Sequence, residues 1–195
     1  MGIKKLLPYL VPATGNGDLR KAALLSLTGA IVAGGFGIVH DQITYTISPE
    51  YFTRMKFDQF RAVDFGLPPR VFVAQIGFLA TWWVGLIATW FLARIALPGF
   101  ESPERRVMKA VAVIVAITTA AGACGFFLGP VLLENRKGWP EALQEMGVTD
   151  NTAFLQVAGV HLGSYAGAFA GWILVTIGFL RMKRDLASQP SISTM

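Results

Sequence analysis

The chain has 195 residues, of which 53% are hydrophobic and only 15% are charged. A soluble domain carries about 25% charged residues, so the composition excludes an ordinary soluble protein and indicates an integral membrane protein. A single cysteine, Cys124, excludes a disulfide framework and a CxxC-type site. The pI is near 9.6, but excess Lys and Arg in a membrane protein reflects orientation, and we expect no nucleic-acid partner.

Four apolar runs predict membrane-spanning helices. The expected spans are residues 22–40, 71–94, 107–133 and 154–180, within a membrane domain of residues 22–181. The outer loops are then residues 41–70 and 134–153, and the tails are residues 1–21 and 182–195. Ser48-Pro49-Glu50 is a helix start signal and predicts a short interfacial helix in the first outer loop. The sequence therefore predicts an all-α fold, an integral membrane four-helix bundle.

Positive charge is divided unevenly between the two sides that four spans create. The tails, Arg181 and residues 94–109 hold eleven Lys and Arg, against six in the two outer loops, whereas acidic residues number four against eight. Segments rich in Lys and Arg stay in the cytoplasm. We therefore expect both termini to be cytoplasmic and the protein to lie in the bacterial inner membrane.

Small residues recur at every fourth position along the last two spans. They are Gly159, Gly163, Gly167 and Gly171 in the last span, and Ala121, Gly125 and Gly129 in the third. Residues at i and i+4 share one side of a helix, and small side chains there let a neighbouring backbone come close. These faces predict tight packing, either inside the bundle or against another chain. His161 points about 180° away from Gly159 and Gly163 and must face a different neighbour.

No Asp, Glu, Lys, Arg or His lies in the central part of any expected span. Pumps, transporters of charged solutes and voltage-gated channels use intramembrane charges, so these classes are disfavoured. Counting about 20 residues from the basic residues at the inner ends of the first and last spans reaches His40, Asp41 and His161. These side chains are expected to lie at one level, near the outer membrane surface.

This outer layer supplies a candidate ligand or switch site. Its members are His40, Asp41, Gln42, Glu50, Tyr51, Glu134 and His161. Imidazoles and carboxylates together suit Fe, Zn or Mn, and the hypothetical metal ligands are His40, Glu50, Glu134 and His161. A His–carboxylate pair would alternatively serve as a pH switch. The simplest alternative is that every span becomes polar at the interface and no site exists.

Several short strings carry a family resemblance. They are His40-Asp41-Gln42-Ile43-Thr44, Glu50-Tyr51-Phe52-Thr53, Ala80-Thr81-Trp82-Trp83-Val84-Gly85, and His161 with Ser164, Tyr165 and Gly167. The chain thereby resembles an uncharacterised group of bacterial four-span inner-membrane proteins with an HDQxT…EYFT motif, which has no established activity. Lys56 and Phe57 stand where that group has a His-Pro pair, so the resemblance implies no third imidazole here.

The leading functional prediction is a non-enzymatic accessory or scaffold subunit of a membrane assembly. Its small-residue faces would pack against a second copy or another membrane protein within the lipid bilayer. The alternative is a metal- or cofactor-binding redox protein with a His/carboxylate site at the outer surface. A third hypothesis, a small exporter of apolar compounds, requires an open cavity between the spans. No Ser/His/Asp or Cys/His arrangement is readable, and no catalytic residue is predicted.

Overall fold

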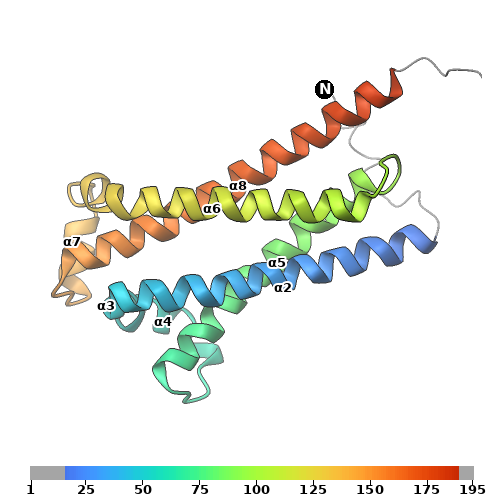
Figure 1. The fold of residues 1–195 in the computed structure, drawn as a ribbon. Helices are drawn as coiled ribbons and strands as arrows, with labels where there is room; N and C mark the ends of the chain where they lie inside the picture. Colours follow the sequence, from blue (N-terminus) through green and yellow to red (C-terminus); the bar gives the residue numbers. More distant parts are fainter. Residues whose placement is uncertain (1–15, 189–195) are drawn as a thin grey trace, which may run out of the picture.

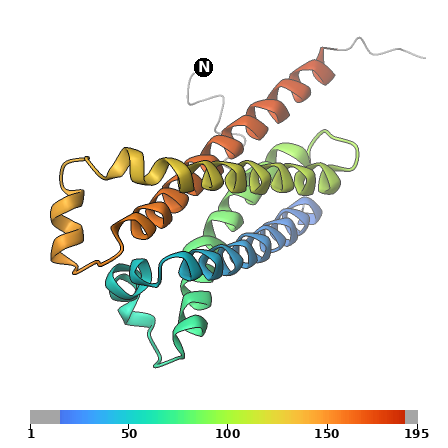
Figure 2. The same ribbon diagram turned by 60° about the vertical axis from the view of Figure 1, so that its left-hand side comes forward.

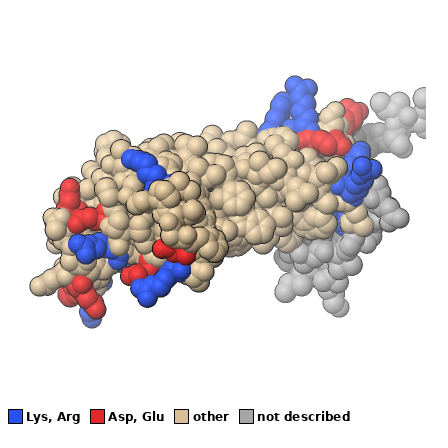
Figure 3. All heavy atoms as spheres, turned by 90° about the horizontal axis from the view of Figure 1, so that it is seen from below, with Lys and Arg blue, Asp and Glu red and all other residues tan. Residues whose placement is uncertain are grey.

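Four long helices form the body of the molecule (Figure 1). The computed structural model describes residues 16–188. The long helices are α2 (Asn16–Ile47), α5 (Pro69–Ala96), α6 (Pro103–Leu133) and α8 (Asn151–Ala187). All four are long and apolar enough to cross a membrane. Charged side chains lie towards the two ends of the molecule, with an uncharged band between them (Figure 3). The predicted all-α membrane four-helix bundle is confirmed.

Short helices cover one end of the bundle (Figures 1 and 2). After α2 they are α3 (Pro49–Tyr51), the π-helix η2 (Phe52–Lys56), α4 (Phe57–Gln59) and the 3-10 helix η3 (Arg61–Val63). After α6 comes α7 (Trp139–Glu145). Ser48 caps α3 as predicted, because its hydroxyl accepts the Tyr51 N–H at 3.4 Å. The predicted interfacial helix is present, but it is broken into these short pieces.

Helix α2 extends to Ile47, beyond the predicted end of the first span at residue 40. Asp41 and Thr44 are 4% and 1% exposed, so both face the interior of the bundle. The Thr44 hydroxyl donates to the backbone oxygen of His40 at 3.0 Å, within the same helix. Polar residues therefore enter the helix here without ending it, since their polar atoms have partners inside the protein.

The four helices form two tightly packed antiparallel pairs, which we call the first helix pair (α2 and α5) and the second helix pair (α6 and α8). In the second pair, a Cβ added to Gly125 would overlap the backbone oxygen of Gly159, and one added to Gly163 would overlap that of Ala121. Gly37 and Gly77 make the equivalent backbone contact in the first pair. Close approach of this kind requires glycine, and in lipid it supplies packing contacts that hold helices together.

The two helix pairs meet through apolar clusters at their ends. The cluster near the α5–α6 loop includes Leu92, Val107 and Phe179. The cluster at the opposite end includes Phe52 and Phe154 and reaches α7. Between them lies a cavity of about 360 Å³ lined by residues of all four long helices. The pairs are therefore joined at both ends and held apart in the middle.

Candidate functional site

Two histidines and an aspartate come together between the helix pairs; we call His40, Asp41 and His161 the histidine cluster. Their potential ligand atoms all lie within 4.8 Å of one another. His40 Nδ1 is 3.0 Å from Asp41 Oδ1, and His161 Nε2 is 3.9 Å from the same oxygen. The two imidazole centroids are 4.7 Å apart. Because His40 and Asp41 belong to α2 and His161 to α8, the cluster exists only when the two pairs are docked.

The glycine faces explain why His161 points at α2. Gly159 and Gly163 use one side of α8 for contact with α6. His161 therefore lies on the other side, as the helical periodicity predicts. The ring of Tyr51 stacks on His161 at 4.8 Å, with an interplanar angle of 16°. His161 is only 4% exposed, and its Nε2 has no hydrogen-bond partner within the described part of the chain.

His40 is held at both ring nitrogens. Its Nδ1 lies beside Asp41, and its Nε2 is 3.2 Å from the hydroxyl of Ser164, one turn after His161 on α8. An ionised carboxylate only accepts hydrogen bonds. Beside an ionised Asp41, the neutral His40 ring therefore donates from Nδ1 and accepts the Ser164 hydroxyl proton at Nε2. Ser164 fixes the orientation of this ring across the interface between the pairs.

The π-helix η2 brings Lys56 to the same cavity as the cluster. The N–H of Phe57 donates to the Phe52 oxygen five residues earlier, which defines the wider turn. In an α-helix, Tyr51 and Lys56 would point about 140° apart, at about 100° per residue. Here both are buried, with exposed fractions of 5% and 8%. Burial lowers the pKa of Lys56, while interaction with Asp41 opposes that shift.

Four of the seven predicted candidates meet here, and three do not. Gln42 donates from Nε2 to the Arg70 backbone oxygen at 2.7 Å and accepts from the Arg70 guanidinium at 3.2 Å, joining α2 to α5. Glu134 is exposed and lies just past the end of α6. Of the four hypothetical metal ligands, only His40 and His161 come together, and Asp41 takes the carboxylate position.

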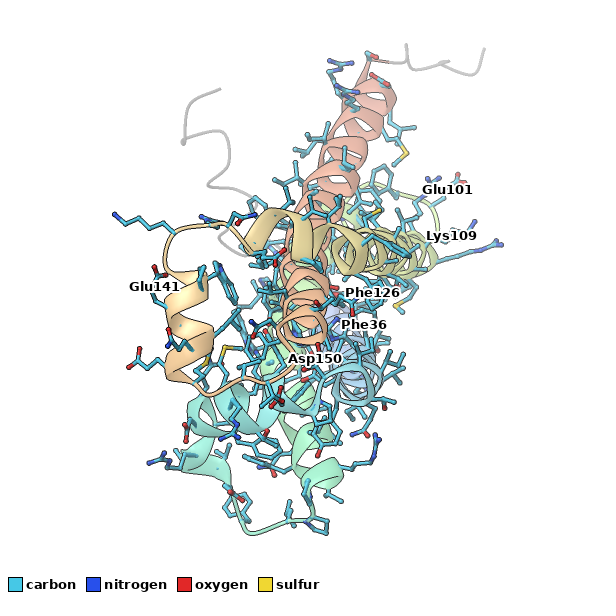
Figure 4. All side chains as sticks on the ribbon, turned by 90° about the vertical axis from the view of Figure 1, so that its left-hand side faces the viewer. Phe36, Glu101, Lys109, Phe126, Glu141 and Asp150 are labelled. Carbon is cyan, nitrogen blue, oxygen red and sulfur yellow. The ribbon has the colours of Figure 1, made fainter. Side chains whose placement is uncertain are left out.

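Glu50 points instead at the start of α8. Its carboxylate accepts the backbone N–H groups of Thr149 and Asp150 at 3.0–3.2 Å, and the Thr149 hydroxyl at 2.9 Å. The Asp150 N–H, more than any other group, holds the pKa of Glu50 below its usual value. Asp150 in turn caps α8 by accepting the Ala153 N–H at 2.9 Å. Glu50 thus links the segment after α2 to the segment before α8, and Figure 4 views the bundle from this end.

Ser164 had a weak signal in the sequence, and Lys56 had none. Ser164 follows His161 by three residues, so helical spacing places both on one side of α8. Lys56 lies in a segment whose alternating aromatic and basic residues suggest a surface helix, and its burial depends on the π-turn. A single widened turn changes which residues face inward without leaving a mark in the hydrophobic pattern.

Comparisons of the chain with protein-family models, curated proteins and solved structures returned no match. Membership of the four-span group with the HDQxT…EYFT motif thus stays a prediction.

Proposed function

We propose that the protein is a membrane metalloprotein that binds one divalent Fe, Zn or Mn ion through His40, Asp41 and His161. The observation that carries this proposal is the convergence of three potential ligand atoms from two helix pairs within 4.8 Å. The buried, unpartnered Nε2 of His161 supports it, since a buried polar atom without a partner costs about 1–3 kcal/mol and is rare.

The donor set matches known coordination chemistry. Two histidines and one carboxylate hold non-haem Fe(II) with open coordination positions, and the same ligand types hold catalytic Zn(II). Ligands about 2.1 Å from one ion in tetrahedral or facial positions lie about 3.0–3.4 Å apart, so the donor atoms, now within 4.8 Å of one another, would need to approach by up to about 1.8 Å. Binding through Nδ1 would require the other neutral tautomer of His40, with the proton on Nε2, because the nitrogen that binds a metal must be deprotonated.

Neighbouring side chains suit such a centre. Metal-bound histidines usually hydrogen-bond through their second ring nitrogen, and Ser164 is placed to do this for His40. Lys56 lines the same cavity, and burial lowers the pKa of its amine, which reduces its repulsion of a cation bound nearby. A centre open to the cavity would suit redox chemistry, as the sequence-based alternative suggests.

The scaffold role remains a prediction with less support. It rests on small-residue faces free to meet another protein, yet Gly159 and Gly163 contact α6 of the same chain. We propose further that the protein lies in the bacterial inner membrane with both termini cytoplasmic. The excess of Lys and Arg in the tails and residues 94–109 supports this orientation.

Metal analysis of the detergent-purified protein tests the proposal. The protein would be purified without a metal-affinity tag, loaded with Fe(II), Zn(II) or Mn(II), dialysed, and analysed by inductively coupled plasma mass spectrometry. We expect one ion per chain, with the preferred ion identified by competition. Asp41→Asn and His161→Gln should abolish stoichiometric binding, because each removes one of three ligands.

Glu134→Gln is the matched control, because it removes an exposed carboxylate outside the cluster. It should retain the full metal content. Equal metal in the wild type and in the folded Asp41→Asn and His161→Gln variants would overturn the proposal. Loss of metal in Glu134→Gln alone would restore the ligand set predicted from the sequence.

A further inference from the structure

We propose that the cavity between the helix pairs binds one neutral, lipid-soluble molecule with an unsaturated body and a hydrogen-bond-accepting oxygen, the chemistry of a quinone. This inference goes beyond the metal site and stands on separate observations: the shape of the cavity, the character of its lining and an unpartnered donor within it.

The size of the cavity fits one small molecule. Its volume is about 360 Å³, within the range of roughly 300–1,000 Å³ for small-molecule sites. Its lining runs along α2 from Gly29 to Asp41, a distance of about 18 Å at about 1.5 Å per residue. The space is therefore long and narrow, and it suits a single extended molecule.

The lining selects a neutral, unsaturated occupant. It is mainly apolar, and its charged residues, Asp41 and Lys56, stand together at one end with opposite signs. A charged molecule lying along the rest of the cavity would be desolvated without a partner, which is costly. The aromatic residues of the lining are Phe36, Trp83, Phe91, Tyr165, Phe169 and Trp172. Such rings pack favourably against other π systems.

An indole nitrogen points to an acceptor on the occupant. Trp172 lines the cavity, and its Nε1 is buried with no hydrogen-bond partner among residues 16–188. By contrast, the Thr118 hydroxyl in the lining donates to its own helix, at 2.8 Å from the Ile114 oxygen. A buried indole N–H usually has a partner. A carbonyl oxygen on the occupant would supply it after a rotation of the indole ring, because Nε1 is itself covered by the surrounding protein.

The cavity is reached from the side of the bundle. Trp83 and Phe169 line it and are nevertheless 49% and 64% exposed. They belong to α5 and α8, whose outer faces lie in the lipid. The end clusters close the cavity above and below these residues. An occupant would therefore enter from the hydrocarbon phase, where lipid-soluble ketones are dissolved.

Binding of decylbenzoquinone to the full-length, EDTA-treated protein tests the inference. Native mass spectrometry in detergent would measure occupancy across a titration, with decylcyclohexane as a probe of similar shape that lacks oxygen. We expect one decylbenzoquinone per chain and weaker binding of decylcyclohexane. Trp172→Phe should weaken quinone binding about fivefold, the effect of one hydrogen bond.

A pair of alanines on α8 supplies a matched comparison. Ala168 lines the cavity, whereas Ala170 is exposed and lies outside the lining. Ala168→Phe should weaken quinone binding at least tenfold, and Ala170→Phe should leave it unchanged. Ala88→Leu fills the cavity from α5 and replaces Ala168→Phe if that variant does not fold.

Unchanged binding in the folded cavity variants would overturn the inference, as would an equal loss in Ala170→Phe. Tighter binding of decylcyclohexane than of the quinone would overturn the assigned chemistry. Because the protein is stripped of metal, failure here leaves the metal proposal intact. A protein that binds the quinone but no metal would refute only the metal proposal.

Discussion

Alanine substitutions along α8 test whether the second helix pair is held by backbone contact. A Cβ added to Gly159 would overlap the Gly125 oxygen and lie 2.6 Å from Gly129 Cα, and neither atom can move by a rotamer change. At Gly171 the nearest atom would be at 3.4 Å, an ordinary contact. At Gly178 no atom would lie within 4 Å. The three glycines thus form a graded series on one helix.

The expected magnitudes follow from this geometry. Gly159→Ala must push α6 and α8 apart, and overpacking of this kind costs about 1–3 kcal/mol. Gly171→Ala should change the unfolding free energy by less than about 0.5 kcal/mol, as ordinary contacts do. Gly178→Ala should be neutral or slightly stabilising, because alanine favours the helix by up to about 1 kcal/mol over glycine.

Reversible unfolding in mixed detergent and SDS micelles, followed by far-UV circular dichroism, measures these differences. Equal losses in Gly159→Ala and Gly178→Ala would refute the backbone-contact explanation. A change in oligomeric state in Gly159→Ala, with unfolding of the single chain unaffected, would show instead that the glycines join separate chains. That result would restore the main support for a scaffold role.

Three further substitutions test the end of the bundle near α3 and α7. Glu50→Gln should lower the unfolding free energy by at most about 1 kcal/mol, because the group is partly exposed. The folded-state pKa of Glu50 lies below the usual 4.5, so the difference from the wild type should be complete near pH 6 and should be lost as the pH falls through the folded-state pKa. Ser164→Ala removes the partner of His40 Nε2 and should weaken metal binding about 10- to 100-fold in a chelator competition, with unchanged affinity refuting its orienting role. Lys56→Met removes an amine that interacts electrostatically with Asp41, so the same assay should show tighter metal binding, and weaker binding would identify the amine as a supporting group.

The fold was predictable because helix length and the apolar pattern are local properties of the sequence. Helical spacing also predicted that His161 and the glycine face point in different directions, and the structure confirms it through contacts with His40 on α2 and with Gly125 on α6. Both follow from the fixed rotation per residue in a helix.

The composition of the site was predicted less well. The two histidines share a level in the membrane, and counting residues along the spans located them. Counting gives depth but not direction, so it grouped Glu50 and Glu134 with them, although Glu50 faces Thr149 and Asp150. The cavity had no sequence signal, because it depends on how two helix pairs meet rather than on either pair alone.

The glycine contacts within each helix pair join long helices that are consecutive in the sequence. The histidine cluster, by contrast, contains residues from both helix pairs. The first helix pair could therefore form soon after it leaves the ribosome, before the second pair is made. An ion bound by His40, Asp41 and His161 would then join the two helix pairs after both have formed. Removal of the ion by a chelator would weaken the contact between the two helix pairs and leave each pair folded.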